Sequence, residues 1–260
     1  MTDFGTLADR WRGAGIAAGD TVLVHSSIKR TLHEAREAGH PLGPQEILAS
    51  LLDAVGAKGT LVLPLFNFGF AGGRDFDIRS TPSEMGALTE CGRLHPDAIR
   101  AGHPIYSFAA IGANSAAFAG VDNESGYAED SPFGILRRLD GKIAVLDLPD
   151  QNSMTFYHHV EEMRQVSCRY FKTFTGNYVD AEGRMSVRSY RLFVRDIENG
   201  VLTHVNPAGE IAWEKGLYSG DRPGCGSGMR VIRAQDMFDL TAWLIDTGQA
   251  EDNLFRREKA

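Results

Sequence analysis

The fold is decided by the stretch Thr-Val-Leu-Val-His-Ser-Ser at residues 21–27. Its first four residues are apolar or β-branched without alternation, which predicts a short strand that is buried on both faces. Strands of this kind belong to sheets that helices cover on both sides. The polar residues His25, Ser26 and Ser27 follow at the carboxyl end, where open α/β sheets place their binding sites.

The same strand pattern recurs along the chain and alternates with helical patterns. Further buried strands are expected at residues 60–63, 107–111 and 142–146. Helices are expected at 44–55 and 154–163, and two more are expected to start at the capping box 81–84 and at Ser131-Pro132. This alternation up to residue 165 predicts an α/β/α sandwich with a largely parallel central sheet.

The C-terminal half has a different pattern. Alternating residues on both sides of 180–183 predict an additional β-hairpin within 178–194, and apolar positions from Met237 to Ile245 predict a final helix. The glycine-rich segment 224–228 lacks the lysine of a phosphate loop and predicts a turn before a strand at 229–232. Since no repeat or linker is visible, we expect residues 1–260 to form a single domain.

The composition excludes several classes of protein. The formal net charge is -7, and no basic stripe with interleaved aromatic residues is present, so we expect no nucleic-acid partner. The three cysteines form no CxxC pair, which argues against a zinc knuckle or a disulfide framework. No signal-peptide pattern and no apolar run of roughly 20 residues occurs, so we expect a cytoplasmic protein without a membrane partner.

The densest group of reactive side chains lies at residues 155–162. On a helix, residues three apart share a face, so Thr155, His158 and Glu161 point the same way, and His159 pairs with Glu162 on another face. A carboxylate beside an imidazole fixes one tautomer and raises the pKa of the ring, which prepares a general base. Thr155 is placed to hydrogen-bond the ring or a reaction intermediate.

Spacing alone leaves other interpretations of this helix open. Histidine and glutamate three apart are often a solvated ion pair of little energetic weight. A metal-dependent hydrolase using His158, His159 and Glu162 is a second alternative, although no further Glu-x-x-His and no His-Glu-x-x-His motif is present.

Three other segments have both a functional and a plain structural interpretation. Ser26 and Ser27 offer hydroxyls and free backbone amides to a thioester carbonyl or a phosphate, or they simply end a strand. The loop that carries His103-Pro104 and Ser107 borders a site, or it is a rigid turn. Ser131 starts a helix that binds phosphate, or it only caps that helix.

Taken together, these segments resemble the aminoglycoside 3-N-acetyltransferase family, also called antibiotic N-acetyltransferases. The resemblance runs in order from about residue 19 to the C-terminal helix. The matching segments are residues 19–27, 55–64 and 81–86, His103-Pro104 with Ser107, Ser131-Pro132 with Leu136, and Thr155-x-x-His158-x-x-Glu161.

The resemblance implies a fold that is not of the GCN5 type, acetyl-CoA as the donor, no metal, and direct transfer to an amine of an aminoglycoside or a related amino sugar. It implies that His158 is the catalytic base, oriented by Glu161, and so distinguishes His158 from His159. It also implies cofactor-binding residues: Ser26 and Ser27 line the thioester and pantetheine region, His103 and Ser107 border the active site, and Ser131 lies near coenzyme A.

The chain departs from the family pattern in places where an acceptor could bind. Residues 100–103 read Arg-Ala-Gly-His, Asp147 replaces an expected glycine, and the segment 31–41 is rebuilt around His33 and His40. These changes leave open a non-aminoglycoside amine or a nucleotide-linked amino sugar as the acceptor. A coenzyme A-binding module without catalysis and a thioester hydrolase are further alternatives. The sequence also leaves open whether the chain forms a homodimer.

Overall fold

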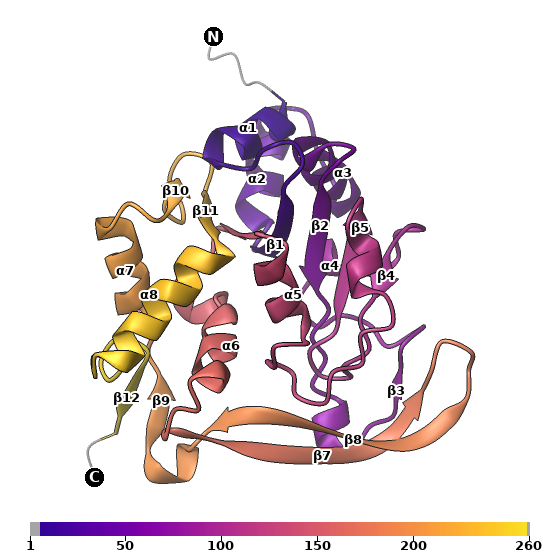
Figure 1. Ribbon diagram of the computed structural model, residues 1–260. Helices are drawn as coiled ribbons and strands as arrows, with labels where there is room; N and C mark the ends of the chain where they lie inside the picture. Colours follow the sequence, from indigo (N-terminus) through magenta and orange to yellow (C-terminus); the bar gives the residue numbers. More distant parts are fainter. Residues whose placement is uncertain (1–5, 259–260) are drawn as a thin grey trace.

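The computed structural model describes residues 6–258, which fold around a seven-stranded sheet of order β10-β11-β6-β1-β2-β5-β4 (Figure 1). The strands are β1 (Thr21–Ser26), β2 (Thr60–Pro64), β4 (Ile99–Arg100), β5 (Phe108–Gly112), β6 (Lys142–Leu146), β10 (Ser219–Gly220) and β11 (Met229–Arg233). The three central strands β6, β1 and β2 pair in parallel, and β11 and β5 flank them in antiparallel orientation. The short edge strands β10 and β4 again point the same way as the centre. The predicted α/β class with a largely parallel sheet is confirmed.

Helices cover both faces of the sheet, as the unbroken apolar strands predict. One face is covered by α1 (Leu7–Ala14), α3 (Pro44–Val55) and α4 (Ala87–Arg93), and the other by α5 (Pro132–Arg138), α6 (Phe156–Met163) and α8 (Ala234–Asp246). In β1 the side chains of Val22 and Val24 enter the first core and that of Leu23 enters the second. Because successive side chains of a strand alternate in direction, both sides of each central strand must be apolar.

The predicted helix start at 81–84 is wrong. The helix α4 begins later, after Gly86, whose backbone has a φ of 111° that favours glycine. The hydroxyls that resemble a capping box serve a loop instead: Thr81 Oγ1 accepts a hydrogen bond from the Asp77 N–H at 2.8 Å, and Ser83 Oγ accepts one from a neighbouring amide. Local side-chain to backbone bonds of this kind compete with helix formation.

The predicted hairpin is present and lies across the carboxyl ends of the central strands. It consists of β7 (Arg169–Val179) and β8 (Met185–Arg195), joined by a turn at 180–184, and β3 (Phe76–Asp77) adds to its edge. In Figure 1 the arrowhead of β2 points toward this curved hairpin, which passes beneath α6. The fold therefore brings the open base of the hairpin, where Arg169 lies opposite Arg195, next to α6.

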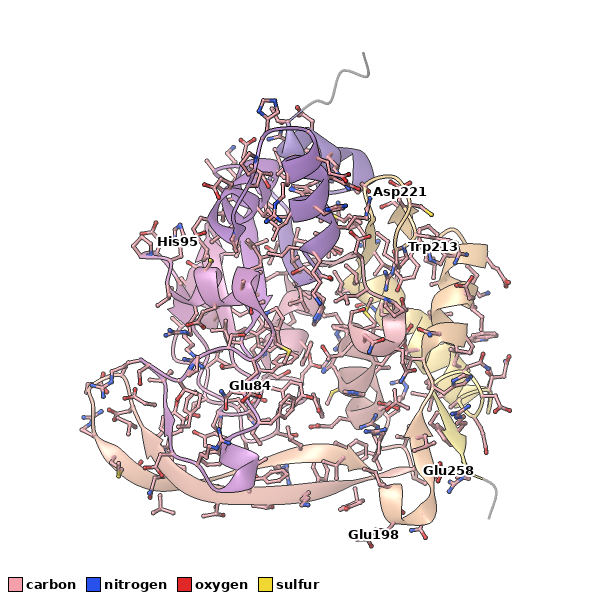
Figure 2. The ribbon with its side chains drawn as sticks, turned by 180° about the vertical axis from the view of Figure 1, so that it is seen from behind. Glu84, His95, Glu198, Trp213, Asp221 and Glu258 are labelled. Atoms are coloured by element: carbon pink, nitrogen blue, oxygen red, sulfur yellow. The ribbon has the colours of Figure 1, made fainter. Side chains whose placement is uncertain are left out.

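Smaller elements complete the molecule. They are α2 (Lys29–Glu37), α7 (Asn206–Glu214), the 3₁₀ turns η1 (Phe70–Gly72), η2 (Ser115–Phe118), η3 (Asp150–Asn152) and η4 (Ile197–Asn199), and the strand pair β9 (Val201–Thr203) and β12 (Phe255–Arg257). Figure 2 shows Glu198 and Glu258 at one end of the molecule, next to the antiparallel pair of β9 and β12. No helix within residues 6–258 is long and apolar enough to cross a membrane.

The central strand β1 offers a direct test of this two-core arrangement. Replacing the buried Leu23 by alanine should lower the free energy of unfolding by about 2–5 kcal/mol, because the cavity cannot close between the sheet and its helices. Replacing the exposed Val187 of β8 by alanine should change it by less than about 0.5 kcal/mol. Urea or thermal unfolding measures both values, and equal effects would contradict the assignment of Leu23 to the core.

Candidate active site

The central feature of the site is a triangle of His158, Glu161 and Arg169. His158 and Glu161 share a face of α6, and His158 Nδ1 lies 2.9 Å from Glu161 Oε2. Arg169 reaches over from the start of β7, with Nη2 2.9 Å from His158 Nδ1 and Nε 2.8 Å from Glu161 Oε2. The His158 side chain is 18% exposed and that of Glu161 only 2%. The imidazole is thus reachable, whereas the carboxylate behind it is not.

The charges in this triangle differ from the expectation based on spacing. The pKa of His158 is lowered, chiefly by burial and then by Arg169, although Glu161 acts in the opposite direction. Burial would raise the pKa of Glu161, but Arg169 and His158 outweigh it and leave that pKa below its usual value. The predicted rise in the pKa of His158 is therefore wrong, since helical spacing revealed neither the burial of the ring nor the guanidinium beside it. The site holds a neutral imidazole beside an ionised carboxylate.

His159 occupies a different environment from His158. Its ring is fully buried against Phe133, and its Nδ1 donates a hydrogen bond to the Tyr127 carbonyl at 2.7 Å. Burial lowers its pKa to about 4. The predicted pairing of His159 with Glu162 is not formed, because Glu162 Oε2 accepts a hydrogen bond from Ser125 Oγ at 2.7 Å instead.

The arrangement does not assemble the metal ligands of the hydrolase alternative. His158, His159 and Glu162 point into three different surroundings. Among residues 6–258, no group of three or more histidine, cysteine or carboxylate side chains is placed to hold a metal ion.

The polar end of β1 meets the start of α6. Thr155 occupies the N-cap position of α6 without capping it, and its Oγ1 lies 3.4 Å from His25 Nε2. Burial, with a contribution from Arg230, lowers the pKa of His25 to about 3. The two segments that the sequence singled out thus meet at one edge of the sheet, where Thr155 lies beside the neutral ring of His25.

Ser26 and Ser27 lie half-buried directly after β1. The expectation of free backbone amides is wrong for Ser27, because its N–H donates to the Leu146 carbonyl at 2.8 Å and extends the sheet. The next unpaired donors in the chain direction are at the start of α2, where Ile28 is the N-cap and no side chain caps the helix.

His103, Ser107 and Ser131 have no exposed surface. His103 Nδ1 accepts hydrogen bonds from two backbone amides of its own loop, and burial lowers the pKa of its ring to about 3. The hydroxyl of Ser107 binds the Leu65 carbonyl and the Arg100 guanidinium. The hydroxyl of Ser131 has no hydrogen-bond partner among the described residues. These three side chains therefore present no surface to solvent.

The position where the family expects glycine has a left-handed backbone. Asp147 has a φ of 50°, a conformation that aspartate tolerates better than most residues. Its carboxylate accepts hydrogen bonds from Arg30 Nε and from the Gly224 N–H, each at 2.9 Å. This substitution therefore ties α2 to the glycine-rich segment 224–228, which forms the predicted turn before β11.

Sequence reasoning missed several residues of the site. Arg169 completes the triangle, and the ring of Tyr127 lies 5.2 Å from that of His158 and 4.8 Å from that of Tyr106. Arg195 lies opposite Arg169 in the hairpin and also disfavours the charged form of His158. No spacing pattern marks these residues, because each reaches His158 through the tertiary fold.

A buried carboxylate anchors α6 from behind. Asp150 accepts hydrogen bonds from the hydroxyls of Tyr157 at 3.0 Å and Tyr218 at 2.9 Å, and it pairs with the buried guanidinium of Arg230. Tyr157 directly precedes His158, so this hub fixes the start of the helix that carries the imidazole. A sequence signal for it was absent, because its members come from four separate segments.

A groove of about 900 Å³ lies elsewhere, between α1, α2 and Gly226–Ser227. Its lining includes Arg10 together with the carboxylates of Asp9, Glu34 and Glu37. None of the predicted site residues lines it, since all of them lie at or behind the carboxyl edge of the sheet.

Comparisons with known proteins agree with the predicted resemblance. Residues 23–244 match the family model described as aminoglycoside 3-N-acetyltransferase. Aminoglycoside N(3)-acetyltransferase VII of Streptomyces paromomycinus is 26% identical over 278 residues, and the match covers 92% of this chain and 90% of that protein. The crystal structure of aminoglycoside acetyltransferase AAC(3)-Xa superposes with a TM-score of 0.76 at 24% identity, covering 95% of this chain and 92% of that one. AAC-IIIb in a binary complex with CoASH gives 0.75 at 21% identity, covering 94% and 96%. At these identities the solved structures show a shared fold.

The Asp150 hub gives a prediction about the support of α6. Replacing Asp150 by alanine should destabilise the protein by about 3–5 kcal/mol, because it leaves the guanidinium of Arg230 buried without a counter-charge. Replacing Tyr218 by phenylalanine removes one hydrogen bond and should cost only about 0.5–1.5 kcal/mol. Unfolding curves of the two variants separate these values, and similar losses would show that the ion pair is not essential.

Proposed function

Because the chain belongs to the aminoglycoside 3-N-acetyltransferase family, we propose that it transfers the acetyl group of acetyl-CoA directly to an amine, with His158 as the general base. One observation carries this proposal. A neutral imidazole, backed by a buried carboxylate at 2.9 Å, remains partly exposed at the carboxyl edge of the sheet. A thioester and an amine both have to reach such a base, and the edge of an α/β sheet is where ligands bind.

The proposed reaction moves one acetyl group and one proton. The amine nitrogen attacks the thioester carbonyl carbon while His158 Nε2 takes a proton from the nitrogen. The carbon–sulfur bond of the tetrahedral intermediate then breaks, and the proton passes from the imidazolium to the thiolate of coenzyme A. General base catalysis of this kind contributes about 10²–10⁴-fold to the rate. These steps need no metal.

We propose that the intermediate oxyanion lies near the end of β1. Thr155 Oγ1 and the uncapped first turn of α2 supply donors there, and Ser26 and Ser27 line the thioester. One donor of this type stabilises a transition state by about 3–4 kcal/mol. The buried His103, Ser107 and Ser131 shape the wall of the coenzyme A site. The CoASH in the AAC-IIIb complex supports a coenzyme A thioester as the donor.

A specific observation favours a second class of acceptor. Aminoglycosides are polycations, yet the guanidinium groups of Arg169 and Arg195 both disfavour positive charge at His158. Arg195 lies directly opposite Arg169, so the two side chains share one face of the hairpin. Arg188 and Arg191 of the same strand pair with Asp122 and Glu124, whereas Arg195 has no such partner within residues 6–258. An amine that carries an anionic group, such as a nucleotide-linked amino sugar, fits this arrangement better than a polycation.

We further propose that the chain acts as a single domain. The strands β10 and β11, from the C-terminal third, complete the same sheet that β1 begins. A division of the chain would expose the edge of β6.

The role of His158 is tested by replacement. His158→Ala and His158→Asn should bind coenzyme A normally but lose about 10²–10⁴-fold in turnover, since the amine then has no base. Replacing His95, on the surface after α4, by alanine is the matched control and should leave turnover unchanged (Figure 2). Release of free thiol from acetyl-CoA measures turnover, and near-normal rates in both His158 variants would remove His158 from the mechanism.

The acceptor class is tested with a panel of amines. Thiol release should be compared for aminoglycosides, neutral amino sugars and nucleotide-linked amino sugars. If the acceptor is anionic, the nucleotide-linked sugars should give the highest kcat/KM, and Arg195→Ala should raise KM for these alone. A preference for aminoglycosides that Arg195→Ala leaves unchanged would instead assign the chain to the polycation substrates of its relatives.

A further inference from the structure

The Nδ1 atom of His158 lies between two partners and can serve only one of them at a time. Glu161 Oε2 and Arg169 Nη2 are each 2.9 Å away. With a hydrogen on Nδ1, the ring donates to the carboxylate. Without one, the lone pair of Nδ1 accepts from the guanidinium, and the hydrogen sits on Nε2. Only the first tautomer leaves Nε2 free to accept a proton from an amine.

The surroundings favour the first tautomer. An ionised carboxylate oxygen is a stronger acceptor than a neutral ring nitrogen. Other groups also hold Arg169, since its Nη1 donates to the Phe193 carbonyl at 3.0 Å and its Nε lies in an ion pair 2.8 Å from Glu161 Oε2. The hydrogen on His158 Nδ1 has only one acceptor within reach, the carboxylate of Glu161. Arg169 therefore stays beside the imidazole without a hydrogen bond to it, as a positive charge in close contact.

We propose that Arg169 is a positioning residue that sets how firmly His158 holds the proton taken from the amine. It does so by fixing Glu161 against Nδ1 and by placing a positive charge beside the ring. Glu161 alone would stabilise the imidazolium and retain the proton, and Arg169 offsets that stabilisation. The proton is then released to the thiolate as the carbon–sulfur bond breaks. The inference rests on the proposed base role of His158.

Because Arg169 is buried, its positive charge acts strongly on the imidazole of His158. The side chains of Arg169 and Glu161 are 5% and 2% exposed, so water and salt screen them little. The other groups that face His158 are Tyr127 from the loop before α5 and Arg195 from β8. Burial raises the pKa of Tyr127 well above its usual value, so this phenol stays neutral, and Arg195 acts in the same direction as Arg169.

These charges determine in which direction each substitution shifts the pKa of His158. Removing the positive charge of Arg169 favours the imidazolium, so the pKa of His158 rises and the acid limb of the pH–rate profile moves to higher pH. Removing the negative charge of Glu161 has the opposite effect, and the acid limb moves to lower pH. Removing both charges together should return the limb toward its wild-type position.

The experiment is a set of pH–rate profiles, with saturating acetyl-CoA and one acceptor, for the wild type, Arg169→Gln, Glu161→Gln, the double variant and Arg169→Lys. The titration of the acceptor amine is common to all of them, so differences report on the enzyme. We expect the limb to shift up by about one to three pH units in Arg169→Gln and down in Glu161→Gln. Arg169→Lys keeps the positive charge but loses the several N–H donors of the planar guanidinium. Turnover should therefore fall, while the acid limb of the profile stays at its wild-type pH.

Two further variants make the outcome specific. Arg184→Gln, at an exposed arginine of the same hairpin, should not move the limb. The double variant removes the buried pair together, so it folds even if a single substitution leaves an unpaired buried charge. A double variant that keeps the limb shift of Glu161→Gln would overturn the inference, as would an Arg169→Gln limb at the wild-type position. If His158→Ala retains the wild-type profile, the proposed base role itself fails.

Discussion

Glu161 is a carboxylate with almost no access to water, and it remains ionised because His158 and Arg169 both lie against its Oε2 atom. A buried charge is tolerated only when it is paired and hydrogen-bonded, so the three side chains depend on one another. The fold provides for this dependence with separate elements. The Asp150 hub holds the start of α6, and the base of the β7–β8 hairpin, which passes beneath α6 (Figure 1), brings the guanidinium of Arg169 to Glu161. The same contacts that stabilise the carboxylate also orient the imidazole.

This constraint explains why the imidazole is neutral rather than charged. A histidine with only a glutamate beside it would hold a proton near neutral pH and could not take another. Burial and the neighbouring cation reverse that tendency at His158. A weak base that accepts a proton only as the amine becomes acidic, and then gives it up, suits a reaction whose leaving group is itself a thiolate. In the reaction that we propose, the second cation, Arg195, disfavours a polycationic acceptor, because like charges repel.

The sequence was informative where the signal is local. Unbroken apolar runs predicted the central strands, because a strand covered on both faces has no polar side. Helical spacing correctly brought His158 and Glu161 to one face of α6, and the family resemblance distinguished His158 from His159. Prediction failed where a polar group can hydrogen-bond to more than one partner and the tertiary fold decides which partner it takes. The hydroxyls at 81–84 serve a loop instead of a helix start, and the Ser27 amide extends the sheet. The pKa of His158 was predicted in the wrong direction because burial of the ring and the approach of Arg169 both come from the tertiary fold, which no spacing pattern reveals.

The central claim is that the His158 imidazole is neutral and carries its hydrogen on Nδ1. Nitrogen-15 NMR of labelled histidine observes this protonation state directly. The protein contains 8 histidines, and the signals of His158 are identified as those missing from the His158→Asn spectrum. Near pH 7, we predict a neutral ring with its hydrogen on Nδ1 and a bare Nε2. A hydrogen on Nε2, or a ring that is already charged at this pH, would contradict the account.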